Sequence, residues 1–268
     1  MVQTTRGDYT DSLYGGFNLG LHVGDIDQTV HQNRATLLAQ LQQEHPTLAS
    51  IHWLNQVHGN HVHHVTDQLL AHTVAADAHI TTLPNVALAI MTADCVPVMI
   101  TSDIACGANN VIAAVHAGWQ GLAKNVIYQT VQKMVHQSDL LEGNTDLEDI
   151  KTLTQGWQAW VGASIAQCNY EVDSRVRAQV LEALAVDEAT DTAERLFKNS
   201  EREGHYFANL AAVAELQLNA CGIHQVFQSQ LDSYGDPRFY SYRSQTQQQL
   251  PATGRMATLI FMAESKPL

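Results

Sequence analysis

The hydrophobic pattern in the first half of the chain predicts three consecutive buried strands. Short, almost uninterrupted apolar runs occupy residues 86–92, 96–101 and 111–116. Runs of this length and character are typical of strands that are covered on both faces of a sheet. Residues 119–136 then carry apolar side chains at helical spacing, which predicts a strand-to-helix junction just after His116. Functional groups often lie at such junctions, because the sheet fixes the strand end and the helix N-terminus offers free N–H groups.

The second half of the chain predicts a mixture of strands and helices. Strands are expected at 159–165, 225–228 and 256–262, and helices at 174–184 and 207–221, with a polar loop at 199–204. Asn209 is the expected cap of the second helix and Gly222 its stop. Because strands and helices follow one another without a regular βαβ rhythm, the pattern favours an α+β fold or a mixed sheet.

One segment lacks periodicity. Residues 138–155 are rich in acidic side chains, and we interpret this stretch as a surface excursion. With 268 residues and 45% hydrophobic content, the chain has enough apolar material for one large domain or two small ones. We treat residues 1–268 as a single catalytic domain that carries this excursion.

The composition indicates a cytoplasmic protein. No apolar run approaches the roughly 20 residues needed to span a bilayer, and the N-terminus has no basic region followed by an apolar stretch, so neither a membrane anchor nor a secretory signal is expected. The cysteines are scattered without CxxC pairs, which suits a reducing compartment better than a disulfide framework; they are Cys95, Cys106, Cys168 and Cys221.

The net charge of −13 excludes nucleic acid as an expected partner, because it would repel a phosphate backbone and no basic run offsets it. The same charge would hinder a small anionic substrate unless a few arginines gather at the site. Arg34, Arg243 and Arg255 are the candidates, since a guanidinium fork suits phosphate. A surface salt bridge is the competing interpretation for each. The 14 histidines lie mostly in polar contexts, so their number alone indicates no metal site.

Three segments each place one metal-binding side chain beside a glycine or a strand end, and the side chains are His58, Cys95 and His116. Imidazole nitrogen and thiolate sulfur both bind zinc, and three protein ligands with an open fourth position form a catalytic site. The three residues are far apart in sequence, so only tertiary folding can bring them together. Other interpretations are a buried structural cysteine, hydrogen-bonded structural histidines, and a metal-free nucleophile pair in which a histidine activates Cys95.

Motifs along nearly the whole chain resemble the bacterial laccase-domain family, also called YfiH-like. They begin with YGGFNLGLHVGD, continue through QVHG, TADC and VHAGW, and end with FYSYR and TGRM. Members of this family have been labelled polyphenol oxidases, peptidoglycan editing factors and purine nucleoside phosphorylases. The resemblance implies that one metal, usually zinc, is held by His58, Cys95 and His116. It also implies two intertwined subdomains with a mixed β-sandwich flanked by helices, similar to the catalytic domain of cytotoxic necrotising factors.

The sequence departs from the family at one place, where Asp232-Ser233-Tyr234 replaces a frequent Cys-Thr-Tyr. Asn18, which lies between two glycines, is expected either to face the substrate or to form a turn. Asp77 and Asp94 are expected either to orient metal ligands as hydrogen-bond acceptors or to act in caps and turns. Trp119 is expected to pack in the core.

The resemblance favours purine nucleoside phosphorolysis with accompanying adenosine deamination, and predicts Asn18, Arg34 and Arg243 as catalytic residues beside the metal ligands. The substrates would be adenosine, inosine or methylthioadenosine together with phosphate. A multicopper oxidase is disfavoured, since the chain has one His-x-His pair, at His61 and His63, and no histidine beside a cysteine. Copper remains an alternative metal. Two further alternatives are a Cys95–His116 hydrolase that edits a cell-wall amino-sugar precursor and a non-enzymatic partner-binding protein with a structural zinc.

Overall fold

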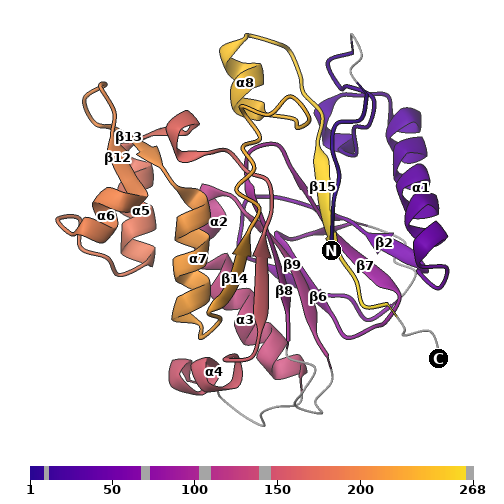
Figure 1. Ribbon diagram of the computed structural model, residues 1–268, viewed down its shortest axis with the longest axis horizontal. Coiled ribbons are helices and arrows are strands. Elements are labelled where there is room, and N and C mark those ends of the chain that lie inside the picture. Colours follow the sequence, from indigo (N-terminus) through magenta and orange to yellow (C-terminus); the bar gives the residue numbers. More distant parts are fainter. Residues whose placement is uncertain (9–11, 68–72, 103–109, 139–145, 264–268) are drawn as a thin grey trace.

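Two mixed β-sheets pack face to face in the computed structural model, which describes residues 1–8, 12–67, 73–102, 110–138 and 146–263 (Figure 1). The four-stranded sheet has the order β1 (Val2–Gln3), β15 (Met256–Ile260), β7 (Val86–Thr92) and β2 (Ser50–His52). The six-stranded sheet has the order β14 (Gln225–Gln228), β10 (Gln158–Val161), β8 (Val96–Thr101), β9 (Ile112–Ala117), β6 (Ala78–Thr81) and β4 (Val62–His64).

Two smaller sheets complete the strand set of the described residues. One pairs β3 (Leu54–Asn55) with β5 (Val74–Ala75), and the other has the order β11 (Glu171–Asp173), β13 (His205–Ala208) and β12 (Phe197–Asn199). The helices are α1 (Asp27–Glu44), α2 (Trp119–Ala123), α3 (Val126–Gln137), α4 (Leu147–Leu153), α5 (Ser174–Ala183), α6 (Asp191–Leu196), α7 (Leu210–Ala220) and α8 (Tyr242–Gln247). Short 3-10 turns are η1 (Leu21–Val23) and η3 (Gln167–Asn169).

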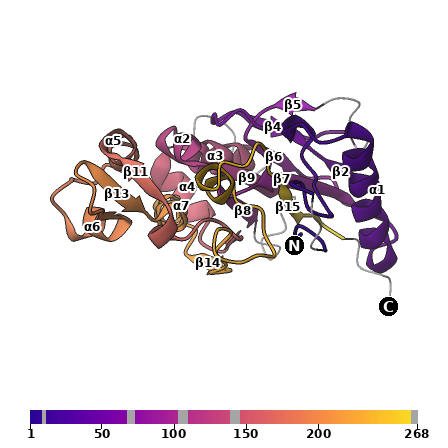
Figure 2. The ribbon, with the colours of Figure 1, turned by 90° about the horizontal axis from the view of Figure 1, so that it is seen from above.

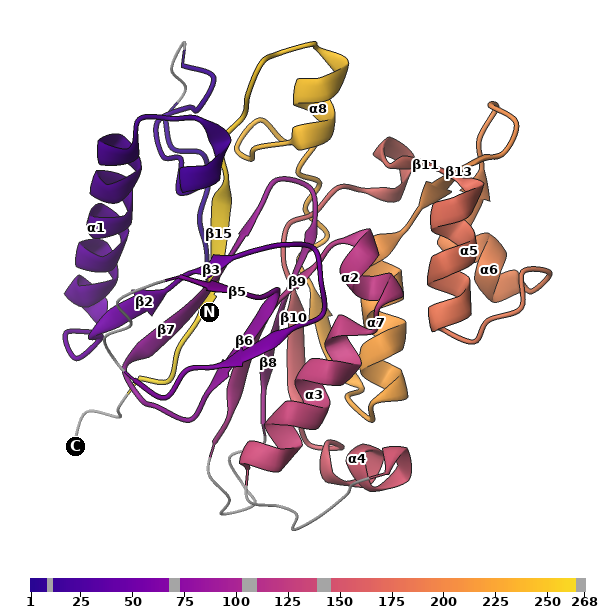
Figure 3. The same ribbon diagram turned by 180° about the vertical axis from the view of Figure 1, so that it is seen from behind.

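Helices cover both outer faces of the paired sheets, which gives a helix–sheet–sheet–helix arrangement (Figure 2). The core between the sheets joins Leu88 and Ile90 of β7 to Met99 of β8. On one outer side α1 packs against the four-stranded sheet through Leu37. On the other side α3 and α7 pack against the six-stranded sheet, while α5, α6 and the three-stranded sheet lie at the far end (Figure 3).

The α+β prediction is confirmed, and the near-continuous apolar runs form central strands of the sheets. β7 and β8 have the predicted bounds, and every residue of β7 and β9 is buried, as expected for strands covered on both faces. The predicted helix over 119–136 is interrupted, because Asn125 adopts a left-handed conformation with φ of 58° and separates α2 from α3. The junction after His116 therefore contains two helices.

Several predicted boundaries were wrong, among them the end of the strand expected at 256–262, which stops at Ile260. The strand expected at 159–165 ends at Val161, since the backbone N–H groups of Gly162 and Ser164 bond instead to Pro97 and Leu231. Within the expected excursion at 138–155, residues 139–145 lie outside the described residues, and 147–153 form α4, which Asp146 caps and Ile150 anchors in the core. The helix expected from 207 begins at Leu210 because 207 and 208 belong to β13.

Several elements were not predicted, above all α1. Only Val30 and Leu37 of its 18 residues are buried, so its sequence has little helical periodicity to detect. Among the described residues, no helix is both long enough and apolar enough to cross a membrane. The likeness to cytotoxic necrotising factors and the treatment of 1–268 as one domain stay predictions.

The predicted cap of α7 provides a stability test. The side chain of Asn209 accepts a hydrogen bond of 3.0 Å from the backbone N–H of Ala212. Asn209→Ala removes that acceptor and is expected to lower the free energy of unfolding by about 1 kcal/mol. The matched change Asn219→Ala lies inside the same helix, where alanine is the better helix former, and is expected to be neutral or slightly stabilising. Urea unfolding of both variants measures the difference, and equal effects would contradict the capping role.

Candidate metal centre

Three chain segments meet where the two large sheets come together. His58 follows β3, Cys95 lies in the turn that carries the chain from β7 of one sheet to β8 of the other, and His116 belongs to β9. One ligand atom from each side chain lies within 4.8 Å of the other two. The structure thus brings together the three residues that the sequence predicted, although no local motif joins them.

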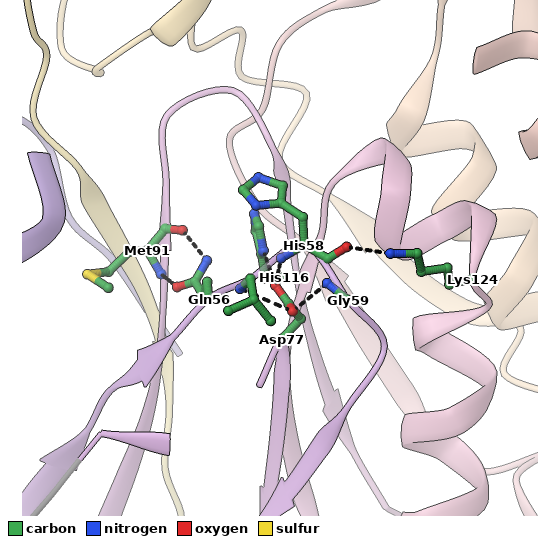
Figure 4. Close-up of polar contacts among 8 residues, drawn as sticks. Gln56, His58, Gly59, Asp77, Met91, His116 and Lys124 are labelled. Carbon is green, nitrogen blue, oxygen red and sulfur yellow. Dashed lines mark hydrogen bonds and ion pairs between the residues drawn. The ribbon is translucent and has the colours of Figure 1, made fainter. Parts of the chain in front are cut away.

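A single buried carboxylate holds both histidine segments. Asp77 is fully buried, and its Oδ1 lies 2.8 Å from Nδ1 of His116. The same carboxylate accepts hydrogen bonds from the backbone N–H groups of His58 at 2.9 Å and Gly59 at 2.6 Å (Figure 4). Because Nδ1 of His116 is engaged, its Nε2 is left for a metal, which is the usual arrangement of a metal-binding histidine. Asp77 therefore orients ligands, one of the two roles predicted for it.

The loop that carries His58 is also fixed to β7. The side-chain amide of Gln56 forms two hydrogen bonds of 2.8 Å with the backbone of Met91, donating to its carbonyl and accepting from its N–H (Figure 4). His58 itself adopts a left-handed backbone conformation with φ of 58°. Such a conformation is costly for a residue with a side chain and persists only where surrounding contacts enforce it. The contacts of Gln56 therefore hold the loop, and with it the His58 imidazole, in place.

The segment that carries Cys95 is fixed from the opposite side by its neighbour Asp94. The Asp94 carboxylate accepts hydrogen bonds from the hydroxyl of Ser233 at 2.7 Å, the hydroxyl of Ser241 at 3.0 Å and the backbone N–H of Arg243 at 2.7 Å. Its backbone is also in the left-handed region, with φ of 95°. Within the described residues these partners lie away from His58 and His116, so Asp94 joins the turn of Cys95 to the segment that begins α8. Burial raises the pKa of Asp94, and these three hydrogen bonds oppose that shift.

The shape and chemistry of the site fit one transition-metal ion. A Cβ atom placed on Gly118 would lie 3.1 Å from the Cys95 sulfur and 3.3 Å from the His58 ring, so glycine leaves room beside the ligands. The two imidazole rings are 4.7 Å apart and nearly perpendicular. His116 is buried, Cys95 is partly buried and His58 is exposed, so the site opens to solvent on the side of His58. Two imidazoles and one thiolate with an open side form a catalytic rather than a closed structural set.

The electrostatics of the metal-free site favour a thiolate. Burial alone would raise the pKa of Cys95, but His116 and His58 next to it lower the value to about 6. Burial alone would lower the pKa of His116, but the Cys95 thiolate and the hydrogen bond to Asp77 raise it to about 9. The thiolate is the form that binds a metal or acts as a nucleophile.

Comparison with known proteins identifies the family. The family described as multi-copper polyphenol oxidoreductase laccase matches residues 1–263. The chain belongs to this laccase family. A relative from Pseudomonas aeruginosa named purine nucleoside phosphorylase is 30% identical over 98% of this chain and 93% of its own length. A second, from Haemophilus influenzae with the same name, is 31% identical over 96% and 91%.

Solved structures of relatives share the fold. The Neisseria meningitidis protein NMB0706 matches with a TM-score of 0.76 and 30% identity over 97% of this chain and 93% of its own. YlmD from Geobacillus stearothermophilus matches with a TM-score of 0.77 and 25% identity over 98% and 91%. The resemblance that the motifs indicated is therefore confirmed at the level of the laccase family and its fold.

The family name refers to several coppers, but this laccase-family chain presents one candidate metal centre within the described residues. His61 and His63, its single His-x-His pair, are not part of that group. The other cysteines with a described position are Cys168, which is exposed, and Cys221, which is buried in the core; Cys106 lies outside the described residues. Neither Cys168 nor Cys221 joins a metal-binding group.

The three arginines predicted at the site lack the salt bridges that were their alternative interpretation. Within the described part of the chain, no carboxylate oxygen lies within 4.0 Å of the guanidinium nitrogens of Arg34, Arg243 or Arg255. Arg243 instead donates to the backbone oxygen of Glu171 at 2.9 Å and lies over the ring of Tyr170 at 4.9 Å. A guanidinium without a carboxylate partner remains able to bind an anionic ligand.

The geometry favours the turn-forming interpretation of Asn18. Its side-chain oxygen accepts from the backbone N–H groups of Gly20 at 2.9 Å and Arg255 at 2.8 Å, and its nitrogen donates to Asp25 at 2.9 Å. The direct catalytic role of Asn18 stays a prediction. Asp232, where the family resemblance led us to expect a cysteine, accepts hydrogen bonds from the backbone N–H of Ala166 and from the Asn169 side chain and so holds a loop. Trp119 packs against the core as predicted.

Sequence reasoning missed two kinds of residue. Gln56 was read only as part of a motif, yet its hydrogen bonds to β7 fix the His58 loop. His22 was not singled out, although it lies within electrostatic reach of both histidine ligands. The family motif that contains His22 was the available signal, but nothing local in the sequence indicates which side chains of that motif approach the metal centre.

Replacing the shared carboxylate tests its role at the metal centre. Asp77→Asn keeps the size of the side chain but offers one acceptor in place of two, so either His116 or the Gly59 N–H loses its partner. We expect zinc affinity, measured by competition with a chromophoric chelator, to fall about 10- to 100-fold. Asp187→Asn, on an exposed loop between α5 and α6, is the control and should bind zinc like the parent. Unchanged affinity in Asp77→Asn would show that the carboxylate does not support the ligands.

The metal affinity should depend on pH in a defined direction. In the metal-free protein the pKa of His116 is raised to about 9 and that of Cys95 lowered to about 6. Between these values a metal must displace the His116 proton, so affinity should fall about tenfold for each unit of pH decrease. Below about pH 6 the thiolate also takes up a proton, and the fall should steepen. Chelator competition from pH 5 to pH 9 measures this slope, and a flat profile would mean that other groups hold the ion.

Proposed function

We propose that this protein is a zinc-dependent purine nucleoside phosphorylase that also deaminates adenosine. The observation that carries the proposal is the open His58–Cys95–His116 site beside arginines that have no carboxylate partner among the described residues. The names of relatives at about 30% identity over nearly the whole chain support the same activity. The substrates are purine nucleosides such as adenosine, inosine and methylthioadenosine, together with inorganic phosphate.

The reaction requires few protein groups. An oxygen of phosphate forms a bond to the anomeric carbon of the ribose, and the bond from that carbon to the purine nitrogen breaks, with its electron pair passing to the purine. The proton that phosphate releases balances the one that the purine takes up. His58, Cys95 and His116 would hold the metal, which when bound supplies a Lewis acid that polarises a group on the substrate or activates water for deamination. Asp77 keeps the His116 ring in one orientation, and guanidinium groups hold the phosphate.

A second candidate is a metal-independent nucleophile. Asp77, His116 and Cys95 follow one another as carboxylate, imidazole and thiolate, and the lowered pKa of Cys95 is what a nucleophilic thiol needs. Such an enzyme would cleave an acyl group, for example in an amino-sugar precursor of the cell wall. Its activity would survive complete removal of metal, whereas the phosphorylase activity should be lost.

The primary assay incubates the zinc-loaded protein with adenosine, inosine or methylthioadenosine, with and without phosphate. Release of free base together with ribose 1-phosphate is expected only when phosphate is present, and ammonia release from adenosine reports deamination. Base release that proceeds equally well without phosphate would contradict phosphorolysis. Oxidation of phenols at a rate that needs three or four coppers per chain would contradict the zinc assignment.

The sharpest variant separates the metal from the fold. Cys95→Ser removes the soft ligand and is expected to abolish zinc binding and nucleoside cleavage, while the protein stays folded because its core is large and separate from the site. Cys168→Ser changes an exposed cysteine outside the site and should retain both properties. Full cleavage by Cys95→Ser, or a large drop in its melting temperature, would contradict a catalytic metal and favour a different role.

A further inference from the structure

Two arginines from separate parts of the chain lie against the segment Asn18 to Val23, which contains His22. Arg34 of α1 donates from Nε and Nη2 to the backbone oxygen of Leu19, at 2.9 and 2.8 Å. The side chain of Arg255 lies against Gly20, where an added Cβ would come within 2.8 Å of its Cγ. His22 stands in η1, two residues further along. The glycine therefore allows an arginine from the C-terminal segment to lie directly beside the histidine and the other arginine.

The guanidinium groups of Arg34 and Arg255 are held in place, but some of their N–H groups have no partner among the described residues. The guanidinium of Arg34 also lies 4.1 Å from the ring of Trp53, which fixes its plane. Nη1 of Arg34 has no hydrogen-bond partner among the residues that the structure describes. The same is true of Nε and Nη2 of Arg255. His22 is exposed, and its imidazole has no hydrogen-bond partner in the described part of the chain. Several N–H donors in a fixed arrangement are thus left for a ligand.

The group faces the metal centre. Desolvation lowers the pKa of His22, and the charges of Arg255, Arg34, His58 and His116 lower it further, to about 4. Burial lowers the pKa of Arg255, whereas the Cys95 thiolate, which acts on its guanidinium, raises it. Contacts place the group at the same position. Nη2 of Arg34 lies 3.4 Å from the sulfur of Met91, and the backbone of Met91 is bonded to Gln56 of the His58 loop. Met256, which follows Arg255, pairs with Thr92 at the end of β7, three residues before Cys95.

The overall charge makes this arrangement unusual. The chain carries 27 acidic residues against 14 lysines and arginines, yet neither Arg34 nor Arg255 has a carboxylate within salt-bridge distance among the described residues. Partly buried cations without a counter-charge are costly, and an anionic ligand removes that cost. A guanidinium presents paired N–H donors that match two oxygens of a phosphate group.

We propose that Arg34, Arg255 and His22 form a phosphate-binding subsite beside the metal centre, and that its ligand is inorganic phosphate. This inference rests on the proposed function, in which the bound phosphate would be the attacking group of the phosphorolysis. It assigns the phosphate to the side of the metal formed by the Asn18–Val23 segment. Arg243, on the side of β11 and α8, lies outside this subsite.

The test measures binding of inorganic phosphate to the zinc-loaded protein by calorimetry, independently of turnover. Arg255→Gln is expected to weaken phosphate binding about tenfold or more, since it removes a charge-assisted hydrogen-bond donor. Arg34→Gln should do the same, but it also loses the bonds to Leu19, so its melting temperature is measured alongside. His22→Gln breaks no described hydrogen bond and should fold like the parent while weakening phosphate binding. Arg202→Gln, an exposed arginine between β12 and β13, is the matched control.

Several outcomes would overturn the inference. Phosphate affinity that is unchanged in both Arg255→Gln and His22→Gln would do so, as would a loss confined to Arg243→Gln. Binding of AMP by the parent without any binding of inorganic phosphate would mean that the cations serve a nucleotide. The proposed function fails in a different way: phosphate binds and depends on Arg255, but no nucleoside is cleaved in its presence. Cleavage that needs phosphate, with binding indifferent to Arg255, would leave the function intact and remove only this subsite.

Discussion

The carboxylate of Asp77 is the group on which the metal centre depends, because it bonds to a ligand side chain and to the backbone of a second ligand at once. Asp77 is fully buried and lies one residue before β6 of the six-stranded sheet. Hydrogen bonds from His116, His58 and Gly59 compensate the cost of burying its charge, and they hold its pKa below the ordinary value although burial acts in the opposite direction. A buried residue that the adjoining strand holds with little freedom therefore sets the distance between the two imidazoles.

A second acid, Asp94, organises the other half of the site. It joins segments that lie further apart in the sequence than those that Asp77 joins. Asp77 acts within the first half of the chain, whereas Asp94 connects the turn of Cys95 to residues 233, 241 and 243 near the C-terminus. Both ligand-bearing loops contain a residue with positive φ, His58 in one and Asp94 in the other. Local strain at these places is compensated by hydrogen bonds from distant segments, which is how a rigid constellation is built on loops.

Sequence reasoning was most successful where a physical constraint is local. Continuous apolar runs identified β7 and β8 to the residue, because strands buried on both faces tolerate few polar side chains. It was least successful for α1, which buries few side chains, and for α4, whose acidic sequence resembles a loop. The metal ligands were found through the family resemblance, since their wide spacing carries no geometric signal. What joins Asp77 to His116 and Arg255 to Gly20 is tertiary contact, which no periodicity encodes.

The position of β15 has a consequence for the order in which the protein can be completed during its synthesis. This strand, at residues 256–260, lies between β1 and β7, and β1 pairs with no other strand of the described chain. The pairing of β1 therefore cannot form until residues 256–260 have been synthesised. The turn of Cys95 likewise gains its Asp94 partners only when residues 233–243 have emerged. Contacts of such long sequence separation form late, so the metal centre of a nascent chain can be completed only after residue 243 has been synthesised.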